Sequence, residues 1–290
     1  MAAASPSRTE CDVDGLRTVV WCAGPPIGDD AVVFVHGNPG SGRSWDPLVE
    51  AVSTFARCVA PDMPGYGETD RPAQFDFSAA GYGKHLGGVL DALELRRAHL
   101  VVHDLGGPWG LAWAASSAER LASLTLIGIG ALPGYRWHRF ARLYRIPVVG
   151  DLVLRTASRR AVKSALGLGS RGGVPDEFVE DVIAQYRDPG TRHAVLAFYR
   201  STPDLGRVTV GAAEALGTVE PPTLVVWGGG DPYVPARFAS LQTTYFRRAE
   251  VVVLPESGHY PLVDDPDAVI AAVVPFLRAS IDADEGAGRR

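Results

Sequence analysis

Long hydrophobic runs, a signal segment and an excess of basic charge are all missing from this sequence of 290 residues. No apolar run approaches the ~20 residues that cross a bilayer, and the first ten residues have neither the basic start nor the apolar stretch of a secretory signal. The formal net charge is -5, so no broad basic face for nucleic acid is expected. We therefore expect a cytoplasmic protein with neither a membrane nor a nucleic acid as its partner.

Cysteine is also scarce. The sequence has 3 cysteines, an odd number without paired spacing, which gives no disulfide framework and no zinc pattern. No metal ligands cluster along the chain, and the glycines at 228–230 precede Asp231 and Pro232 rather than the Lys-Ser or Lys-Thr of a phosphate-binding loop. We therefore expect neither a metal nor an organic cofactor.

What the sequence does contain is an alternation of short apolar, β-branched runs with helical patterns. This alternation is typical of βα units, so we predict an α/β fold with a mostly parallel central sheet and helices on both faces. The predicted strands cover residues 18–21 at a sheet edge, 31–35, 57–60, 100–103, 124–127, 223–227 and 251–254. The predicted helices cover residues 46–55, 79–93, 107–116, 235–246 and 266–280. We expect frayed ends, the segment 283–290 among them.

The alternation is interrupted once, between residues 131 and 217. This stretch contains no convincing strand but shows helical spacing at 176–186 and 192–199, and it is too long for a structureless loop. We interpret it as a helical cap over the strand ends, where open α/β sheets bind ligands. The predicted organisation is thus a first core part (1–130), a cap insertion (131–217) and a second core part (218–290).

The segment LVVHDLGGPWG, residues 100–110, predicts a sharp strand-to-helix turn at Asp104. Such a turn presents the nucleophile in α/β hydrolases. The usual nucleophile there is serine, and the residue two positions earlier is usually glycine, whereas this chain has Asp104 and Val102. The alternative is that Asp104 only caps the helix that follows.

Three further segments favour the catalytic interpretation. HGNPG, residues 36–40, follows one predicted strand and suggests Asn38 as an oxyanion-hole donor, with the N–H of Leu105 as the second. Asp231 and His259 each follow a later strand. Taken alone each segment could be an ordinary turn, but the order nucleophile, acid, histidine is the order of this fold.

Residues 15–280 resemble the α/β-hydrolase superfamily. VVHD-x-GG, HGNP, APDMPGYGETDRP (residues 60–72) and GHYP are similar to segments of its haloalkane dehalogenase and epoxide hydrolase branch. The branch assignment depends mainly on Asp104, because an aspartate nucleophile attacks a carbon that carries a leaving group and forms an alkyl–enzyme ester. His259, oriented by Asp231, would then activate a small-molecule co-substrate, water, to hydrolyse that ester.

The resemblance leaves two substrate classes open. In epoxide hydrolases a cap tyrosine protonates the opening ring, and Ala-Phe-Tyr-Arg at 197–200 resembles their W-Y-R stretch. Tyr199 is therefore the candidate acid, with Tyr144 or Tyr135 as its partner. Because that match is short, Tyr199 could equally be an ordinary packing residue.

In dehalogenases the halide is held by an asparagine and by a tryptophan after the nucleophile. Here Asn38 is present but Leu105 replaces the tryptophan, so Trp109 or Trp137 would have to donate instead. Both indoles are alternatively core residues. Epoxide hydrolysis is therefore our first prediction and dehalogenation the second.

Two less favoured alternatives remain, an esterase or lyase that uses Asp104 as a base and a non-catalytic protein that binds a small molecule. A complete Asp104, Asp231 and His259 set argues against the second, since binding alone does not require it. The sequence does not reveal the oligomeric state, and a homodimer stays open.

Overall fold

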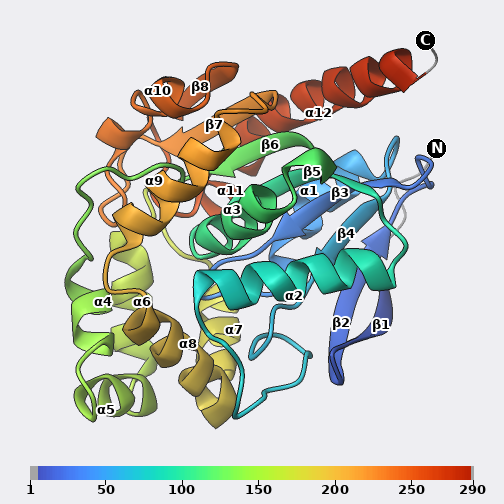
Figure 1. Ribbon diagram of the computed structural model, residues 1–290. Helices are drawn as coiled ribbons and strands as arrows, with labels where there is room; N and C mark the ends of the chain where they lie inside the picture. Colours follow the sequence, from blue (N-terminus) through green and yellow to red (C-terminus); the bar gives the residue numbers. More distant parts are fainter. Residues whose placement is uncertain (1–5, 289–290) are drawn as a thin grey trace.

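A single sheet of eight strands organises the computed structural model, which describes residues 6–288 (Figure 1). The strand order is β1-β2-β4-β3-β5-β6-β7-β8, with β1 and β2 antiparallel to their neighbours and the other strands parallel. The strands are β1 Ser7–Val13, β2 Leu16–Ala23, β3 Asp30–Val35, β4 Cys58–Pro61, β5 Arg97–His103, β6 Leu121–Ile127, β7 Thr223–Gly228 and β8 Ala249–Leu254. The predicted fold class is confirmed.

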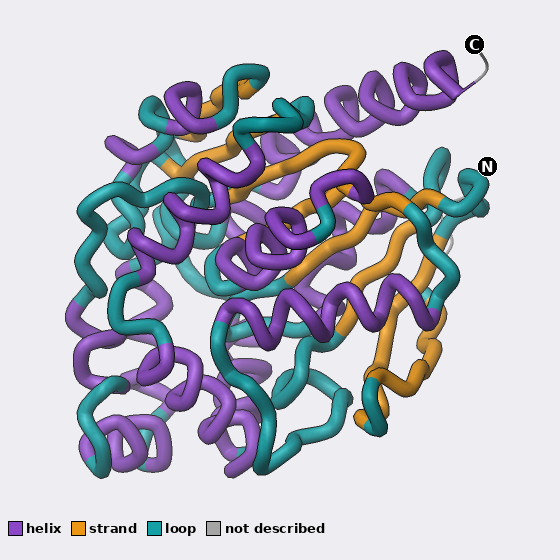
Figure 2. The backbone as a smooth tube through the Cα atoms, in the orientation of Figure 1, coloured by secondary structure: helices purple, strands orange, loops and turns teal. Residues whose placement is uncertain are grey.

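Helices cover both faces of this sheet (Figures 1 and 2). One face carries α2 Ala79–Ala92, α3 Gly106–Ser116 and α9 Leu205–Leu216, which pack against one another. The other carries α1 Asp46–Val52 and α12 Pro266–Gly288, which contact each other. Short helical segments follow at η1 Gly42–Trp45, η2 Ala118–Arg120, η3 Ala236–Phe238, α10 Gln242–Tyr245 and α11 Pro261–Asp264.

The central strands alternate their side chains between two hydrophobic clusters. In β3, Val33 and Val35 join the cluster under α2 and α3, whereas Val32 and Phe34 join the cluster under α1 and α12. Successive side chains of a strand point to opposite faces, and here both faces are covered. This is why β3 reads as a continuous apolar run in the sequence.

A helical insertion separates β6 from β7. It consists of α4 Arg139–Tyr144, α5 Val149–Arg155, α6 Arg159–Leu168, α7 Asp176–Arg187, α8 Pro189–Ser201 and the returning α9. Within the described residues no strand lies between β6 and β7. Figure 1 shows α4 to α8 gathered at one end of the sheet, at the lower left. That this insertion acts as a cap stays an interpretation.

Several predicted bounds were wrong. The predicted edge strand at 18–21 is part of β2, which lies inside the sheet because β1 pairs along its outer side. β1 escaped prediction because it carries alternating polar residues and is largely exposed. The predicted helix at 235–246 consists of two short pieces, η3 and α10, separated by a turn.

The chain end also differs from the prediction. α12 continues to Gly288, so the part of the expected frayed segment up to that residue is helical, while residues 1–5 and 289–290 lie outside the described part. Across residues 6–288, no helix has both the length and the apolar character needed to cross a membrane.

Candidate active site

The turn between β5 and α3 places Asp104 in a strained backbone conformation. Its φ is 48°, in the left-handed region that a non-glycine residue rarely adopts. Gly106 makes the turn possible, because a Cβ atom there would collide with the carbonyl oxygen of Val35. Strain of this kind at a strand-to-helix turn is what the nucleophile elbow requires.

The unusual Val102 before the turn has a matching glycine on α3. A Cβ atom on Gly110 would lie 2.6 Å from Cγ1 of Val102. In the usual pattern a glycine on the strand leaves room for the helix. Here Gly110 on the helix leaves room for the valine on the strand. The departure from the common pattern therefore leaves the elbow intact.

His259 lies between two carboxylates. Its Nδ1 is 2.7 Å from Oδ2 of Asp231, and its Nε2 is 3.4 Å from Oδ1 of Asp104. Asp231 follows β7 and His259 follows β8, and both side chains are buried. The structure therefore brings together the three residues that the sequence suggested, although their catalytic roles stay predictions.

Asp231 is held from both sides. Its Oδ2 faces His259, while Oδ1 accepts hydrogen bonds from the backbone N–H groups of Tyr233 at 2.8 Å and Val234 at 2.9 Å. Backbone donors on one oxygen fix the orientation of the carboxylate plane. The other oxygen can then orient the imidazole.

The two oxygens of Asp104 have different surroundings. The backbone N–H of Asn38 donates to Oδ2 at 2.8 Å, whereas Oδ1 faces His259. Gly37 permits this approach, because a Cβ atom there would lie 2.5 Å from Cβ of Asp104. Of the two predicted oxyanion-hole donors, Asn38 therefore already binds a carboxylate oxygen, and Leu105 follows Asp104 directly in the chain.

Electrostatics favour an ion pair between Asp104 and His259. Burial alone would raise the pKa of Asp104, but the hydrogen bond and charge of His259 outweigh it and lower this pKa to about 2. Burial alone would lower the pKa of His259, but the charge of Asp231 and the hydrogen bonds to Asp104 and Asp231 raise it to about 10. The resting site thus holds a carboxylate and an imidazolium.

Two other histidines support the loops around this pair. His36 accepts a hydrogen bond from the N–H of Met63 at its Nε2, and its Nδ1 lies 2.8 Å from the carbonyl of Gly37. Burial lowers the pKa of His36, so it serves as a neutral structural link. His103 was not predicted, and its Nε2 lies 2.8 Å from the backbone oxygen of His259.

A cavity of about 260 Å³ lies between Asp104 and the helical insertion. The end of the cavity at the core includes Asn38, Asp104 and His259. The rest of the lining comes mostly from the insertion and combines aromatic with aliphatic side chains: Pro39, His138, Phe140, Tyr144, Val153, Leu154, Thr156, Ala157, Ala161, Val162, Ala165, Leu166, Val182, Tyr186, Tyr199, Tyr233 and Tyr260. An apolar chamber with a few polar groups at one end is the usual form of a small-molecule site.

Tyrosines dominate the polar part of this cavity. Tyr144 and Tyr199 lie with ring centroids 5.4 Å apart, and both line the cavity. Burial raises the pKa of Tyr144 to about 12 and that of Tyr199 well above its usual value. Both hydroxyls therefore remain proton donors throughout the physiological range.

A third tyrosine, Tyr186, contacts Asn38. The Nδ2 group of Asn38 donates to its hydroxyl oxygen at 3.4 Å. Tyr186 belongs to α7, whose helical spacing was recognised, but nothing in that spacing distinguishes a tyrosine that lines a cavity from one that packs in a core. Tyr233, Tyr260 and His138 also line the cavity and were not predicted, because they lie in connecting segments without a periodic pattern.

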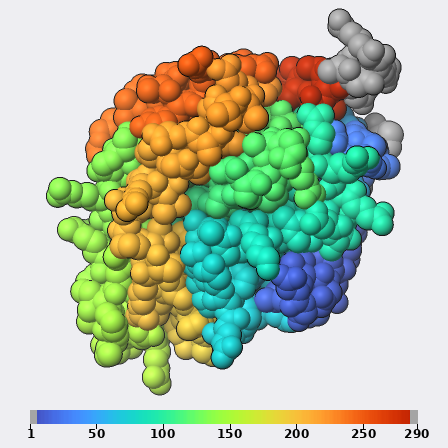
Figure 3. Space-filling view, viewed as in Figure 1, coloured from blue at the N-terminus to red at the C-terminus, as the bar shows by residue number. Residues whose placement is uncertain are grey.

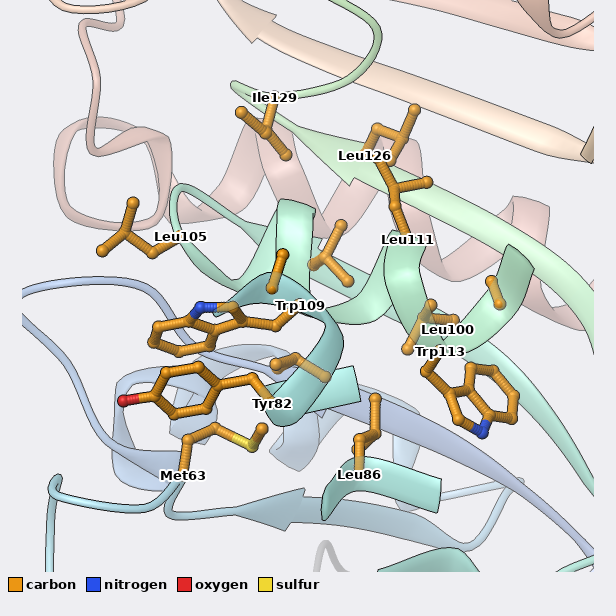
Figure 4. Packing of buried hydrophobic residues seen from close by; sticks show 14 of the residues in the cluster. Met63, Tyr82, Leu86, Leu100, Leu105, Trp109, Leu111, Trp113, Leu126 and Ile129 are labelled. Carbon is orange, nitrogen blue, oxygen red and sulfur yellow. The ribbon is translucent and has the colours of Figure 1, made fainter. Parts of the chain in front are cut away.

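Three residues predicted to contact substrate lie outside the cavity. Trp109 is fully buried in the core and stacks on Tyr82 with centroids 4.2 Å apart (Figure 4). Trp137 donates from Nε1 to the carbonyl of Thr202, and Tyr135 donates to the carbonyl of Tyr233. Core packing and backbone hydrogen bonds occupy these groups, so their predicted contact with substrate is not supported.

No group of three or more His, Cys, Asp or Glu side chains among residues 6–288 is arranged to hold a metal ion. The three cysteines are unpaired thiols.

The chain is similar in sequence to known proteins of the α/β-hydrolase fold. The sequence model of the α/β-hydrolase fold matches residues 30–266. The chain is 29% identical to an acetyltransferase component of the acetoin cleaving system from Pseudomonas putida, over 95% of this chain and 70% of that protein. It is 27% identical to a haloalkane dehalogenase of Mesorhizobium japonicum, over 85% of this chain and 84% of the relative. It is also 27% identical to a cis-3-alkyl-4-alkyloxetan-2-one decarboxylase of Shewanella oneidensis, over 86% and 82% of the two chains.

Solved structures give the same picture of the fold. Haloalkane dehalogenase DbeA from Bradyrhizobium elkani superposes with a TM-score of 0.83 at 23% identity, covering 96% of this chain and 99% of the other. The epoxide hydrolase CorEH superposes with a TM-score of 0.81 at 16% identity, covering 94% and 99%. The predicted superfamily is confirmed, and both kinds of enzyme in the predicted branch appear among the similar proteins.

Proposed function

The chain belongs to the α/β-hydrolase fold family, and from this premise we propose that it hydrolyses epoxides to diols through an ester of Asp104. Relatives and similar structures support a hydrolase that acts on a small molecule with water. The finer proposal concerns the substrate and the covalent step. It depends on one observation, the pair of tyrosines that share the cavity with Asp104.

The tyrosine pair supplies what epoxide opening requires. When a carboxylate attacks a ring carbon, the C–O bond breaks and the ring oxygen becomes an alkoxide that must be protonated. Tyr144 and Tyr199 both line the cavity from the insertion, whereas Asp104 lines it from the core. A substrate between them can be attacked on one side and protonated on the other.

In the first step, Oδ1 of Asp104 attacks the ring carbon and forms the ester. The tyrosine proton passes to the ring oxygen. Esterification removes the negative charge of Asp104, and the pKa of His259 falls because one of its two carboxylate partners has become neutral. His259 can then return a proton to the tyrosinate and become the neutral imidazole that the second step requires.

In the second step, neutral His259 takes a proton from water, and the hydroxide attacks the ester carbonyl. The carbonyl oxygen is the former Oδ2, next to the N–H of Asn38, which stabilises the oxyanion as an oxyanion-hole donor does. Collapse releases the diol and restores the Asp104 carboxylate and the His259 imidazolium. We assign Asp231 the role of orienting His259 and stabilising its charge, and the insertion the role of a cap that excludes bulk water.

Haloalkane dehalogenation is the second candidate, because Asn38 lines the cavity and a relative carries that name. A halide needs N–H donors rather than an acid. Leu105 has no side-chain donor, and the indoles of Trp109 and Trp137 lie outside the cavity. Loss of one such donor typically costs about 10²–10³ in rate at related anion sites, so we place this reaction second.

A paired assay tests the substrate class. Aryl and alkyl epoxides are followed by diol formation, and brominated alkanes are followed by halide release. We expect diol without halide. Halide without diol would overturn the epoxide proposal in favour of dehalogenation. Turnover of activated esters alone would instead indicate that Asp104 acts as a base.

Trapping the ester tests the mechanism independently. His259→Gln is expected to form the ester without hydrolysing it, so the intact protein should gain the mass of one substrate molecule. Asp104→Ala is the control and should gain nothing. A substrate that wild-type protein consumes but that leaves no adduct on His259→Gln would contradict the ester mechanism.

A further inference from the structure

An exposed apolar surface lies at the far end of the helical insertion. It contains Leu143 (38% exposed), Ile146 (48%), Val148 (77%), Val149 (38%) and Leu152 (59%), which we call the apolar tip. All five come from α4, α5 and the turn between them, within ten residues of sequence. Figure 1 shows α5 at the lower left extremity of the molecule, and Figure 3 shows the yellow-green part of the chain forming that edge.

The turn that presents the apolar tip is strained and fixed. Val148 has a φ of 67°, unfavourable for a β-branched residue. The N–H of Val149 donates to the carbonyl of Pro147, and the N–H of Gly150 donates to the carbonyl of Ile146. Gly150 is packed closely, because a Cβ atom there would lie 2.5 Å from the carbonyl oxygen of Tyr144. The backbone thus holds its most exposed valine outward at an energetic cost, which is a pointer to function.

The segment that carries the apolar tip is rich in positive charge. Residues 131–163 contain eight Lys and Arg and one acidic residue, Asp151, in a chain whose net charge is -5. Two of these cations, Arg159 and Lys163, are paired with Asp176 or Glu180 of α7. Asp151 is paired with Arg200 at 2.8 Å. Arg136, Arg139, Arg142 and Arg155 are exposed. We call these four exposed arginines the basic rim. The insertion therefore carries both an exposed apolar surface and exposed positive charge.

The cavity reaches the surface beside this rim. Val153 and Leu154 of α5 line the cavity, whereas Leu152 of the same helix is exposed. Two other lining residues, Thr156 and Ala161, are exposed at the junction of α5 and α6. One short helix thus connects the apolar tip with the wall of the cavity.

We propose that the apolar tip and its basic rim dock on the surface of an anionic lipid bilayer. Apolar side chains enter the region between headgroups and acyl chains, while arginines contact lipid phosphates, which is the pattern of interfacial membrane binding. This proposal departs from the sequence prediction that a membrane is not a partner. That prediction concerned apolar segments long enough to cross a bilayer, whereas docking on its surface needs no such segment. The cavity mouth would then face the bilayer, from which a lipophilic substrate could enter.

Charge decides against a second copy of this chain as the occupant. A symmetric dimer through the apolar tip would bring two basic rims together, which electrostatic complementarity disfavours. Each arginine instead strengthens the attraction to an anionic surface. The inference does not depend on which ester-forming reaction the site performs, so failure of either proposal leaves the other standing.

Vesicle co-sedimentation of the full chain tests the proposal. We expect binding to vesicles of phosphatidylcholine with phosphatidylglycerol, weak binding to phosphatidylcholine alone, and loss of binding at high salt. Val148→Ser with Leu152→Ser should lower the partition coefficient by roughly tenfold or more, because apolar area is lost. Arg139→Gln and Arg142→Gln should each lower it about fivefold.

Matched controls come from exposed residues elsewhere. Val219→Ser, at 46% exposure, and Arg96→Gln should leave vesicle binding unchanged. Turnover of a water-soluble substrate should stay the same in the tip variants, which also reports that they fold. Equal binding of wild type and tip variants would overturn the proposal. The proposal would also be overturned if the protein formed a dimer in solution without vesicles and the Val148→Ser and Leu152→Ser substitutions dissociated that dimer.

Discussion

At the scale of single residues, the charge on Asp104 controls the protonation of His259. The imidazole lies between two carboxylates, one of which becomes an ester in the proposed reaction. His259 therefore holds an extra proton while Asp104 is ionised, and it can act as a base once Asp104 is esterified. A serine in this position would require the histidine as a base from the start.

The titration of His259 provides the first prediction. Its pKa in the folded protein, measured from imidazole NMR shifts, should lie near 10. Asp104→Asn should lower it, because one carboxylate partner is lost. A pKa near 6.5 in both proteins would contradict the ion pair.

The same shift has a consequence for stability. The raised pKa of His259 stabilises the folded state. This contribution is complete below about pH 6.5, the pKa of histidine in the unfolded chain, and it is lost as the pH rises through about 10. The lowered pKa of Asp104 contributes stability above about 3.9, lost as the pH falls towards about 2. Urea unfolding at pH 7 and pH 10 should therefore show a larger loss for wild type than for Asp104→Asn.

Two tyrosine hydroxyls give the second prediction. Tyr144→Phe and Tyr199→Phe should each lower kcat for an epoxide at least tenfold, and together by about 10²–10⁴, the usual contribution of a general acid. Tyr135→Phe is the control, because that hydroxyl donates to the carbonyl of Tyr233 outside the cavity. Unchanged kcat in the double variant would remove both residues as the acid.

At the scale of elements, the strand-to-helix turn depends on close backbone approach. Gly106→Ala should lower the free energy of unfolding by about 1–3 kcal/mol, because the new methyl group meets the carbonyl of Val35. Gly211→Ala is the matched control, since that glycine is exposed in α9 and a Cβ atom there would meet nothing within 4 Å beyond the backbone of its own helix. Alanine there should add about 0.5–1 kcal/mol. Equal effects in urea unfolding would contradict the steric argument.

The sequence predicted those elements whose pattern reflects burial. β3 and β5 were recognised because both faces of the sheet are covered, which leaves a continuous apolar run. β1 was not recognised, because its exposed edge carries polar residues. Asp104, Asp231 and His259 were found because each follows a strand end in a fixed order.

The rest of the site could not be predicted in the same way. Tyr186 belongs to a helix whose spacing is the same for packing and for lining a cavity, and Tyr233 lies in a connection without periodic spacing. Trp109 was considered as a donor, but a large indole close behind the elbow is more stably buried against Tyr82. Which helix face meets the cavity is decided by tertiary packing, and one sequence does not contain that information.

At the scale of the whole molecule, one carboxylate joins the insertion to the loop that carries His259. Asp264 accepts from the N–H of Gly258 at 2.6 Å, from the N–H of Arg171 at 3.2 Å and from the hydroxyl of Ser170. The N–H of His259 in turn donates to the carbonyl of Gly169. The insertion and the second part of the core are thus joined at His259.

Removal of this connection is the fourth prediction. Asp264→Ala should lower the free energy of unfolding by about 1.5–3 kcal/mol, because several backbone N–H groups lose their hydrogen-bond acceptor. Amide exchange should accelerate in residues 169–172. Asp267→Ala is the control, since that exposed carboxylate lies in the first turn of α12 and should change stability little. Exchange that rises equally in both variants would contradict the proposed role.

The unequal surroundings of the two Asp104 oxygens imply an isotopic asymmetry. The N–H of Asn38 retains Oδ2, whereas Oδ1 faces His259. In the proposed reaction Oδ1 leaves with each diol and is replaced from water, while Oδ2 remains. After many turnovers in water enriched in oxygen-18, the peptide containing Asp104 should gain one heavy oxygen and not two. The nucleophile would then keep one oxygen from its synthesis and renew the other with every turnover.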